Sequence, residues 1–156
     1  MNILQQKIDE NKVRLGRMGE ICVGNWASLL GMSVLHSIDP YDRRKDLIIN
    51  GRRVEVKTQV PYILEHAFSI RENQINKCRS VDELYFVALP SPNSKYIYEG
   101  SGWIYQVNSK TFLTREIITR AGHKMILIDI KQDAVVPVQQ IDQSDIDQMM
   151  KYSNSI

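Results

Sequence analysis

Three residues of the stretch Arg44–Gln59, RKDLIINGRRVEVKTQ, carry side chains suited to metal-assisted chemistry: Asp46, Glu55 and Lys57. Carboxylates are the hard oxygen ligands that Mg²⁺ prefers. A Mg²⁺ ion held by one or two of them keeps several waters and often binds phosphate oxygens. A lysine beside such an ion can hold a phosphate or a metal-bound hydroxide. These residue types therefore favour a Mg²⁺ site that binds phosphate.

A two-residue hairpin turn brings these side chains to one side of a sheet. The strand-like runs LII and VEV flank Asn50-Gly51, a pair that suits a turn with positive φ at both positions. The turn sets Asp46 opposite Glu55 as a non-hydrogen-bonded pair, with Cα atoms roughly 4.5 Å apart. Lys57 follows two residues later and shares their face. We therefore expect all three groups to lie within a few ångströms of one another.

The opposite face of this hairpin is wholly apolar, with Leu47, Ile49, Val54 and Val56. We expect it to pack on a core. On the charged face, two carboxylates placed opposite each other repel, which destabilises the pairing unless a cation lies between them. That cation is a metal ion in one interpretation. In the alternative, the face is solvated and Lys57, Arg53 and Arg44 neutralise the acids.

A helix expected over residues 13–30 adds a third carboxylate, Glu20. Its apolar residues recur at helical spacing: Leu15, Met18, Cys22, Trp26 and Leu29. Small residues lie along one edge of that apolar face: Gly16, Gly19 and Ala27. They would let the helix sit close to a sheet, and Gly31 is a suitable C-terminal stop. Glu20 lies on the same edge and could approach the hairpin. The alternative is a glutamate at the boundary of the exposed surface.

The rest of the chain predicts a mixed α/β (α+β) fold. A capping box at Ser69–Glu72 predicts a helix over 70–79, whose Arg71, Gln74 and Lys77 can reach polar neighbours. Residues 60–68 are expected to form a loop near the site, because Pro61 blocks a central strand. Strand-like segments are expected over 32–37, 83–89, 103–107, 117–130 (a hairpin) and 135–138, and a last helix begins at Ser144.

Composition bounds the class of protein. The 156 residues are 43% hydrophobic and 24% charged, which is typical of one globular domain over 1–156. The sequence has no apolar run long enough to predict a membrane span, and its N-terminal residues lack the apolar core of a signal peptide. We therefore expect a cytoplasmic protein. Cys22 and Cys78 have no metal-ligand spacing and are expected to be reduced and buried.

The net charge of +2 is too small to indicate nucleic-acid binding by itself. Its distribution says more, because five basic residues cluster at the two ends of the hairpin: Arg43, Arg44, Lys45, Arg52 and Arg53. Such a cluster can neutralise phosphates. The alternative is a rim of interspersed charges that keeps the protein soluble.

This layout resembles the PD-(D/E)XK nuclease superfamily, which has the restriction-endonuclease-like fold. The matching motif is Asp46, eight intervening residues, then Glu55-Val56-Lys57, preceded by the helix that carries Glu20 and followed by a helix and an apolar strand. The likeness covers residues 13–90. Lys45 stands where many members have a proline. The implied fold is a mixed central sheet flanked by helices, with additional strands over 96–138 and a terminal helix over 143–152.

The resemblance implies a Mg²⁺-dependent endonuclease, with Mn²⁺ as a substitute ion. Asp46 and Glu55 would bind the ion with the Val56 carbonyl, and Lys57 would position or deprotonate the attacking water. Glu20 would orient a second ion or its water shell. Double-stranded or branched DNA would contact Arg43, Arg44, Arg52, Arg53, Gln59 and Gln74.

Two groups within the superfamily are similar to this chain through Gly16-x-x-x-Glu20 and Gln74. They are the archaeal Holliday-junction resolvases and the small phage and intron-encoded homing endonucleases. A phage enzyme would act in the host-cell cytoplasm. Cutting both strands of a duplex with one active site per chain implies a homo-oligomer, a dimer or tetramer, whose interface or base contacts the strands within 96–131 could supply. Two other classes stay open: a non-catalytic nucleic-acid-binding protein on the same fold, and a partner-binding module.

Overall fold

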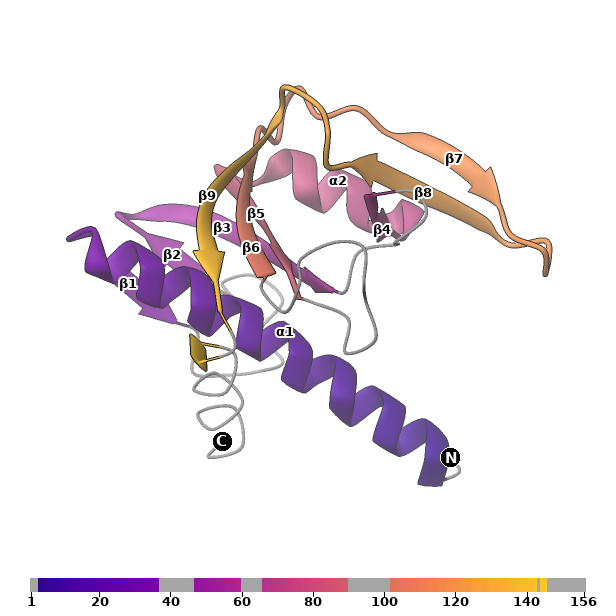
Figure 1. Cartoon of the computed structure of the whole chain (residues 1–156), viewed down its shortest axis with the longest axis horizontal. Coiled ribbons are helices and arrows are strands. Elements are labelled where there is room, and N and C mark those ends of the chain that lie inside the picture. Colours follow the sequence, from indigo (N-terminus) through magenta and orange to yellow (C-terminus); the bar gives the residue numbers. More distant parts are fainter. Residues whose placement is uncertain (1–2, 37–46, 60–65, 90–101, 143, 146–156) are drawn as a thin grey trace.

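The computed structural model describes residues 3–36, 47–59, 66–89, 102–142 and 144–145, with side chains from residue 15 onward. These residues form a mixed α+β structure (Figure 1). Its helices are α1 (Ile3–Leu29) and α2 (Glu72–Ser80). Its strands are β1 (Val34–His36), β2 (Leu47–Ile49), β3 (Arg52–Gln59), β4 (Ala67–Ile70), β5 (Glu83–Ala88), β6 (Gly102–Val107), β7 (Arg115–Ile118), β8 (Lys124–Asp129) and β9 (Val135–Ile141).

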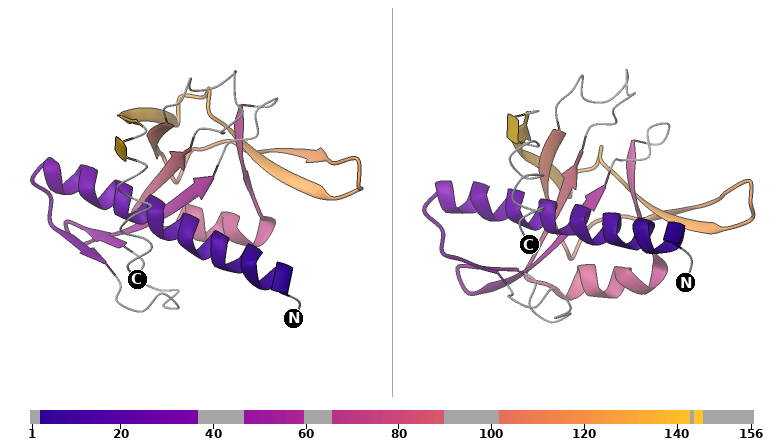
Figure 2. Two further views of the ribbon diagram at one scale, coloured as in Figure 1. Left: turned by 60° about the horizontal axis from the view of Figure 1, so that its bottom comes forward. Right: turned by 90° about the horizontal axis from the view of Figure 1, so that it is seen from below.

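A six-stranded sheet in the order β1-β2-β3-β5-β6-β9 forms the centre of the fold. β3 and β5 are parallel, and the other neighbouring pairs are antiparallel. α1 packs on one face of this sheet, while α2 and a second sheet, β4-β8-β7, pack on the other (Figure 2). Each face has its own apolar core. Successive residues of β3 therefore point alternately toward α1 and toward α2.

The hairpin between β2 and β3 forms as predicted. Asn50 and Gly51 both have positive φ, 51° and 76°. Leu47 pairs with Val54 and Ile49 with Arg52, which is the predicted register. Leu47, Ile49 and Val54 are buried in the core under α1, with Val56 packed partly buried against it, so the predicted apolar face is confirmed.

α1 begins at Ile3, ten residues before the predicted start at residue 13. The apolar spacing identified only the part that packs on the sheet. The preceding residues contain neither glycine nor proline and continue the helix, which extends past the sheet in Figure 1. Gly31, with φ of 83°, follows the end of the helix as predicted.

The predicted capping box at Ser69–Glu72 is wrong. Ser69 lies in β4, which pairs with β8, and α2 begins only at Glu72. Arg71 is the N-cap residue and makes no side-chain capping bond. The backbone N–H of Ser69 donates to the Gln59 Oε1 atom at 2.8 Å, so Gln59 holds this segment in strand geometry.

The predicted strands after α2 are confirmed. β5 lies inside the central sheet, with Leu84, Phe86 and Val87 fully buried, and β9 is an edge strand of that sheet. β7 and β8 form the predicted hairpin, which extends away from the body of the molecule beside β4 (Figure 1). Neither α1 nor α2 has an apolar stretch long enough to span a membrane. The predicted terminal helix lies outside the described residues except for 144–145.

Candidate active site

Glu55 is the centre of a buried charged cluster on β3. Its carboxylate is only 6% exposed, yet it contacts two ammonium groups. Lys57 Nζ lies 3.1 Å from Oε1, and Lys77 Nζ lies 3.3 Å from Oε2. A buried carboxylate is tolerated only when charged or hydrogen-bonding groups satisfy it. Each oxygen of Glu55 therefore has its own lysine.

Two elements position this cluster. The two-residue period of β3 places Glu55 and Lys57 on the face toward α2. Gln74 and Lys77 are three residues apart and share one face of α2. Lys57 Nζ donates to Gln74 Oε1 at 3.1 Å. The chain crosses from β3 through α2 to the parallel strand β5, so this crossover sets α2 over β3.

Cys78 lies next to the cluster on α2 and is fully buried. Burial raises the pKa of its thiol to about 11, outweighing the neighbouring lysines. Burial likewise raises the pKa of Cys22, to about 12. A thiol is nucleophilic only as a thiolate. Neither cysteine is therefore set up for chemistry, which agrees with the prediction of buried thiols.

Alternate backbone carbonyls of β3 point away from β5. The carbonyls of Arg53 and Gln59 accept hydrogen bonds from Asp82 and Leu89, on the β5 side. Alternate carbonyls along a strand point in opposite directions, so the Val56 carbonyl points toward the β2 side. In the described residues β2 ends its pairing with β3 at Val54. The predicted ligand Val56 thus presents its oxygen at an edge that the described strands do not cover.

Glu55 and Val56 provide two of the oxygen donors predicted for a Mg²⁺ ion, a carboxylate and a carbonyl. Both carboxylate oxygens of Glu55 contact lysines in this structure. Asp46 lies outside the described residues, as do Arg43 and Arg44. Within the described part of the chain, no three His, Cys, Asp or Glu residues gather in a way that could hold a metal. The pairing of Asp46 with Glu55 therefore stays a prediction.

Glu20 comes from the other side of the sheet. Its carboxylate is 18% exposed, and Arg17 Nη1 lies 3.3 Å from its Oε2. The neighbouring Gly19 lies against Thr58 of β3, one residue after Lys57, with no room for a Cβ atom between them. Thr58 faces α1, whereas Lys57 faces α2. A role for Glu20 in the site stays a prediction.

The other predicted contact residues in the described chain make internal contacts. Arg52 Nε lies 3.7 Å from Glu83 Oε1, although the Arg52 side chain is 60% exposed. Arg53 donates to the Ser80 carbonyl at the end of α2 at 3.0 Å. Both arginines thus help to fix the hairpin turn against its surroundings.

Gln59 and Gln74 also have structural partners. The side-chain amide of Gln59 donates to the Ser69 carbonyl at 2.9 Å and accepts from the Ser69 N–H, which links β3 to β4. Gln74 accepts from Lys57, as described above. Lys77 was not among the predicted site residues. It was expected only as a helix residue able to reach polar neighbours, and its spacing of three residues from Gln74 could have assigned it to the site.

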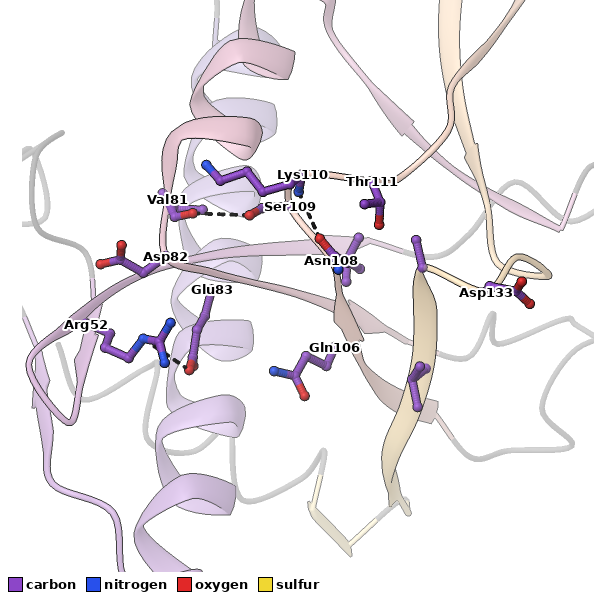
Figure 3. Close-up of a pocket in the computed structure, with 13 residues that line it drawn as sticks. Arg52, Val81, Asp82, Glu83, Gln106, Asn108, Ser109, Lys110, Thr111 and Asp133 are labelled. Atoms are coloured by element: carbon purple, nitrogen blue, oxygen red, sulfur yellow. Dashed lines mark hydrogen bonds and ion pairs between the residues drawn. The ribbon is translucent and has the colours of Figure 1, made fainter.

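A separate cleft of about 710 Å³ lies at the turn end of the hairpin (Figure 3). Arg52 and Lys110 oppose Asp82, Glu83 and Asp133 among its lining residues. Arg52 alone among the predicted site residues lines it. The cluster around Glu55, rather than this cleft, is therefore the candidate active site.

Comparison of the chain with protein-family models, with curated proteins and with solved structures finds no match.

Proposed function

We propose that this chain is a Mg²⁺-dependent DNA endonuclease with the restriction-endonuclease-like fold, which hydrolyses phosphodiester bonds. The observation that carries the proposal is the buried carboxylate of Glu55 with Lys57 beside it at 3.1 Å. The order of elements supports it: α1, the hairpin of β2 and β3, the crossover helix α2 and the parallel strand β5. This is the layout that the sequence motif of the superfamily requires.

Each residue of the cluster has a distinct role in this proposal. A bound Mg²⁺ would lower the pKa of a coordinated water and stabilise charge that develops on the phosphate. Glu55 and the Val56 carbonyl would hold the ion together with Asp46. Lys57 carries three N–H donors. Gln74 and Glu55 use two of them, which leaves one for the attacking water or a phosphate oxygen.

Local charge favours binding of a phosphate. Two ammonium groups surround the Glu55 carboxylate. With Asp46, which the proposal adds to the site, the protein charges would cancel, and a bound Mg²⁺ would make the site positive overall. Low exposure strengthens such charges relative to charges in bulk water. A phosphodiester that enters this site would meet fixed positive groups, which lower the barrier because they need not reorganise as charge develops.

The test is cleavage of supercoiled plasmid and of a four-way DNA junction in Mg²⁺. The wild type should nick or linearise one of them, whereas Lys57→Ala and Asp46→Asn should not. Lys57→Ala should still bind DNA, because it removes one donor and leaves Lys77 in place. Lys131→Ala, at an exposed lysine outside the cluster, is the matched control and should cleave normally.

Other outcomes select the alternative functions. Preferred cleavage of the four-way junction would identify a Holliday-junction resolvase, and preferred cleavage of duplex DNA a homing- or phage-type enzyme. DNA binding that Asp46→Asn does not change, with no cleavage by any variant, would indicate a non-catalytic nucleic-acid-binding protein. Absence of salt-dependent DNA binding would exclude both nucleic-acid functions and leave the partner-binding module.

A further inference from the structure

We propose that the outer part of the β7–β8 hairpin, residues 117–125, is an arm that enters a groove of duplex DNA beside the candidate active site. This inference rests on the DNA-binding part of the proposed function. It assigns a DNA contact to a segment, the outer ribbon (residues 117–125), that contains none of the predicted site residues.

The outer ribbon projects beyond the three-stranded sheet β4-β8-β7. β4 pairs with β8 only as far as Ile70 opposite Ile126. β7 and β8 continue past this point as a pair, with Ile118 opposite Lys124. Figures 1 and 2 show the hairpin extending away from the rest of the described structure. The ribbon is therefore two strands wide, and no other described strand pairs with its edges.

Internal hydrogen bonds fix the turn at the tip of the ribbon. The Thr119 N–H donates to the His123 carbonyl, and the Gly122 N–H donates to the Thr119 carbonyl, both at 2.9 Å. The His123 N–H also donates to Thr119 Oγ1 at 3.1 Å. Gly122 has a φ of 82°, which a glycine adopts without strain. A tip that is ordered before it meets a partner loses little conformational entropy on binding.

The charge of the outer ribbon suits a polyanion. It contains Arg120, His123 and Lys124 and no acidic residue. Glu116 and Glu72 lie 3.1 and 3.5 Å from Lys124 Nζ and offset its charge. Among the described residues none forms an ion pair with Arg120, which is exposed at the turn. Arg120 can therefore contact a phosphate, and the exposed His123 ring can donate a hydrogen bond to a phosphate or a base edge.

The dimensions of the ribbon match a DNA groove. Neighbouring strands lie about 4.8 Å apart, and the major groove, about 12 Å wide, admits a two-stranded β-ribbon. At about 3.4 Å per residue, the chain between Ile126 and the turn at Ala121 rises by up to roughly 17 Å. The groove is about 8.5 Å deep. The ribbon is thus long enough to reach the base edges while the body of the protein stays outside the groove.

Contacts at the base of the ribbon set it beside the candidate active site. Lys124 pairs with Glu72 in the first turn of α2, and two residues later Gln74 accepts from Lys57 of the cluster. Gln59, two residues after Lys57 on β3, bonds to β4. The ribbon therefore leaves the molecule near the end of β3 that carries Lys57. A duplex bound at the cluster would pass this end of α2, where the ribbon can enter its groove.

The test is binding of a fluorescent duplex of about 30 base pairs, and of one of its single strands, measured by anisotropy in EDTA at several salt concentrations. EDTA prevents metal-dependent cleavage, so the result is independent of catalysis. Arg120→Ala should weaken duplex binding by about fivefold at low salt and reduce the slope of log K against log salt by about 0.9. It should change single-strand binding by less than about twofold, because only a duplex has a groove.

The controls are a charge-retaining substitution and a remote lysine. Arg120→Lys keeps the charge and should keep the wild-type salt slope. Lys131→Ala removes an exposed charge outside the ribbon and should change duplex binding by less than about twofold. Thermal unfolding of each variant checks that it is folded, and sedimentation reports its oligomeric state.

The outcomes distinguish this inference from the proposed function. If folded Arg120→Ala binds the duplex as the wild type does, or loses duplex and single-strand binding equally, the groove contact is wrong, and cleavage by the wild type would leave the nuclease proposal standing. A changed oligomeric state with unchanged DNA binding would likewise overturn the inference, because the ribbon would then contact a second copy of the chain.

Two further outcomes concern the wild type. If Arg120→Ala shows the expected loss but the wild type cleaves no DNA in Mg²⁺, the ribbon contact stands on a non-catalytic DNA-binding protein. If the wild type shows no salt-dependent DNA binding, the proposed function and this inference are both wrong.

Discussion

Replacement of Glu55 by glutamine tests whether its buried contacts with lysine stabilise the protein. Glu55→Gln keeps the shape of the side chain and removes its charge. In the absence of metal, the two ammonium groups that now lie 3.1 and 3.3 Å from its carboxylate oxygens would then lose this negative partner. Loss of one partner of a buried ion pair destabilises more than the pair itself stabilises.

The size of the effect follows from the exposure of the partners. Hydrogen bonds to charged groups contribute about 1.5–3 kcal/mol each. Lys57 and Lys77 are 22% and 36% exposed, so water recovers part of this loss. We therefore expect Glu55→Gln to lower the free energy of unfolding by about 2–3 kcal/mol in total.

The assay is urea unfolding in EDTA at pH 7, followed by the fluorescence of Trp26 and Trp103. With a slope of about 2 kcal/mol per molar urea, the midpoint should fall by roughly 1–1.5 M. Glu116→Gln is the matched control, because Glu116 forms a surface pair with Lys124 and is 59% exposed. It should cost less than about 0.5 kcal/mol. A Glu55→Gln variant as stable as the wild type, or more stable, would refute the reasoning.

Three further predictions concern packing and titration. Gly19→Ala would place a Cβ atom 1.6 Å from Thr58 Oγ1, so α1 must shift away from β3. We expect the free energy of unfolding, measured in urea, to fall by about 3 kcal/mol. Adding Thr58→Ala should recover only part of this loss, because the Thr58 Cβ is itself 2.8 Å from the new Cβ. Burial raises the pKa of Cys22 to about 12 and of Cys78 to about 11, from 9.0. Their contribution to stability should be complete below pH 9 and decline as the pH rises from 9 toward 11. The urea midpoint of a double alanine variant should therefore fall less steeply over that range than the wild-type midpoint. Partial desolvation and the neighbouring Arg17 lower the pKa of His36 below 6.5. Its contribution to stability should therefore be present above pH 6.5 and be lost as the pH falls below it. His36→Gln should lose less stability than the wild type between pH 7 and pH 5, and an equal loss in both would contradict this.

The sequence predicted the hairpin well because its determinants are local. Asn50-Gly51 fixes both the turn and the register, and the structure has Leu47 opposite Val54 as expected. The apolar strand β5 was equally clear from its composition. Such features need no knowledge of distant parts of the chain.

The misassigned region, by contrast, depends on contacts between distant segments. Ser69 has the sequence pattern of a helix cap, yet Gln59, ten residues earlier, takes its N–H, and β8 pairs with its strand. A local sequence pattern cannot reveal that a distant residue takes the backbone N–H group on which a helix cap depends. Lys77 was expected to reach polar neighbours but was not assigned to the site for a related reason: which face of α2 meets Glu55 depends on how the crossover sets the helix over β3.

The charged cluster also has a consequence for folding. Lys57 is two residues from Glu55 on one strand, whereas Lys77 is 22 residues away and lies beyond β4. A two-residue hairpin such as that of β2 and β3 closes in about 1–10 μs, but closing a parallel crossover involves more distant segments and is slower. Glu55 therefore gains its first lysine early and its second only when α2 docks and β5 pairs with β3. The final burial of this carboxylate should accordingly coincide with the slow step of refolding.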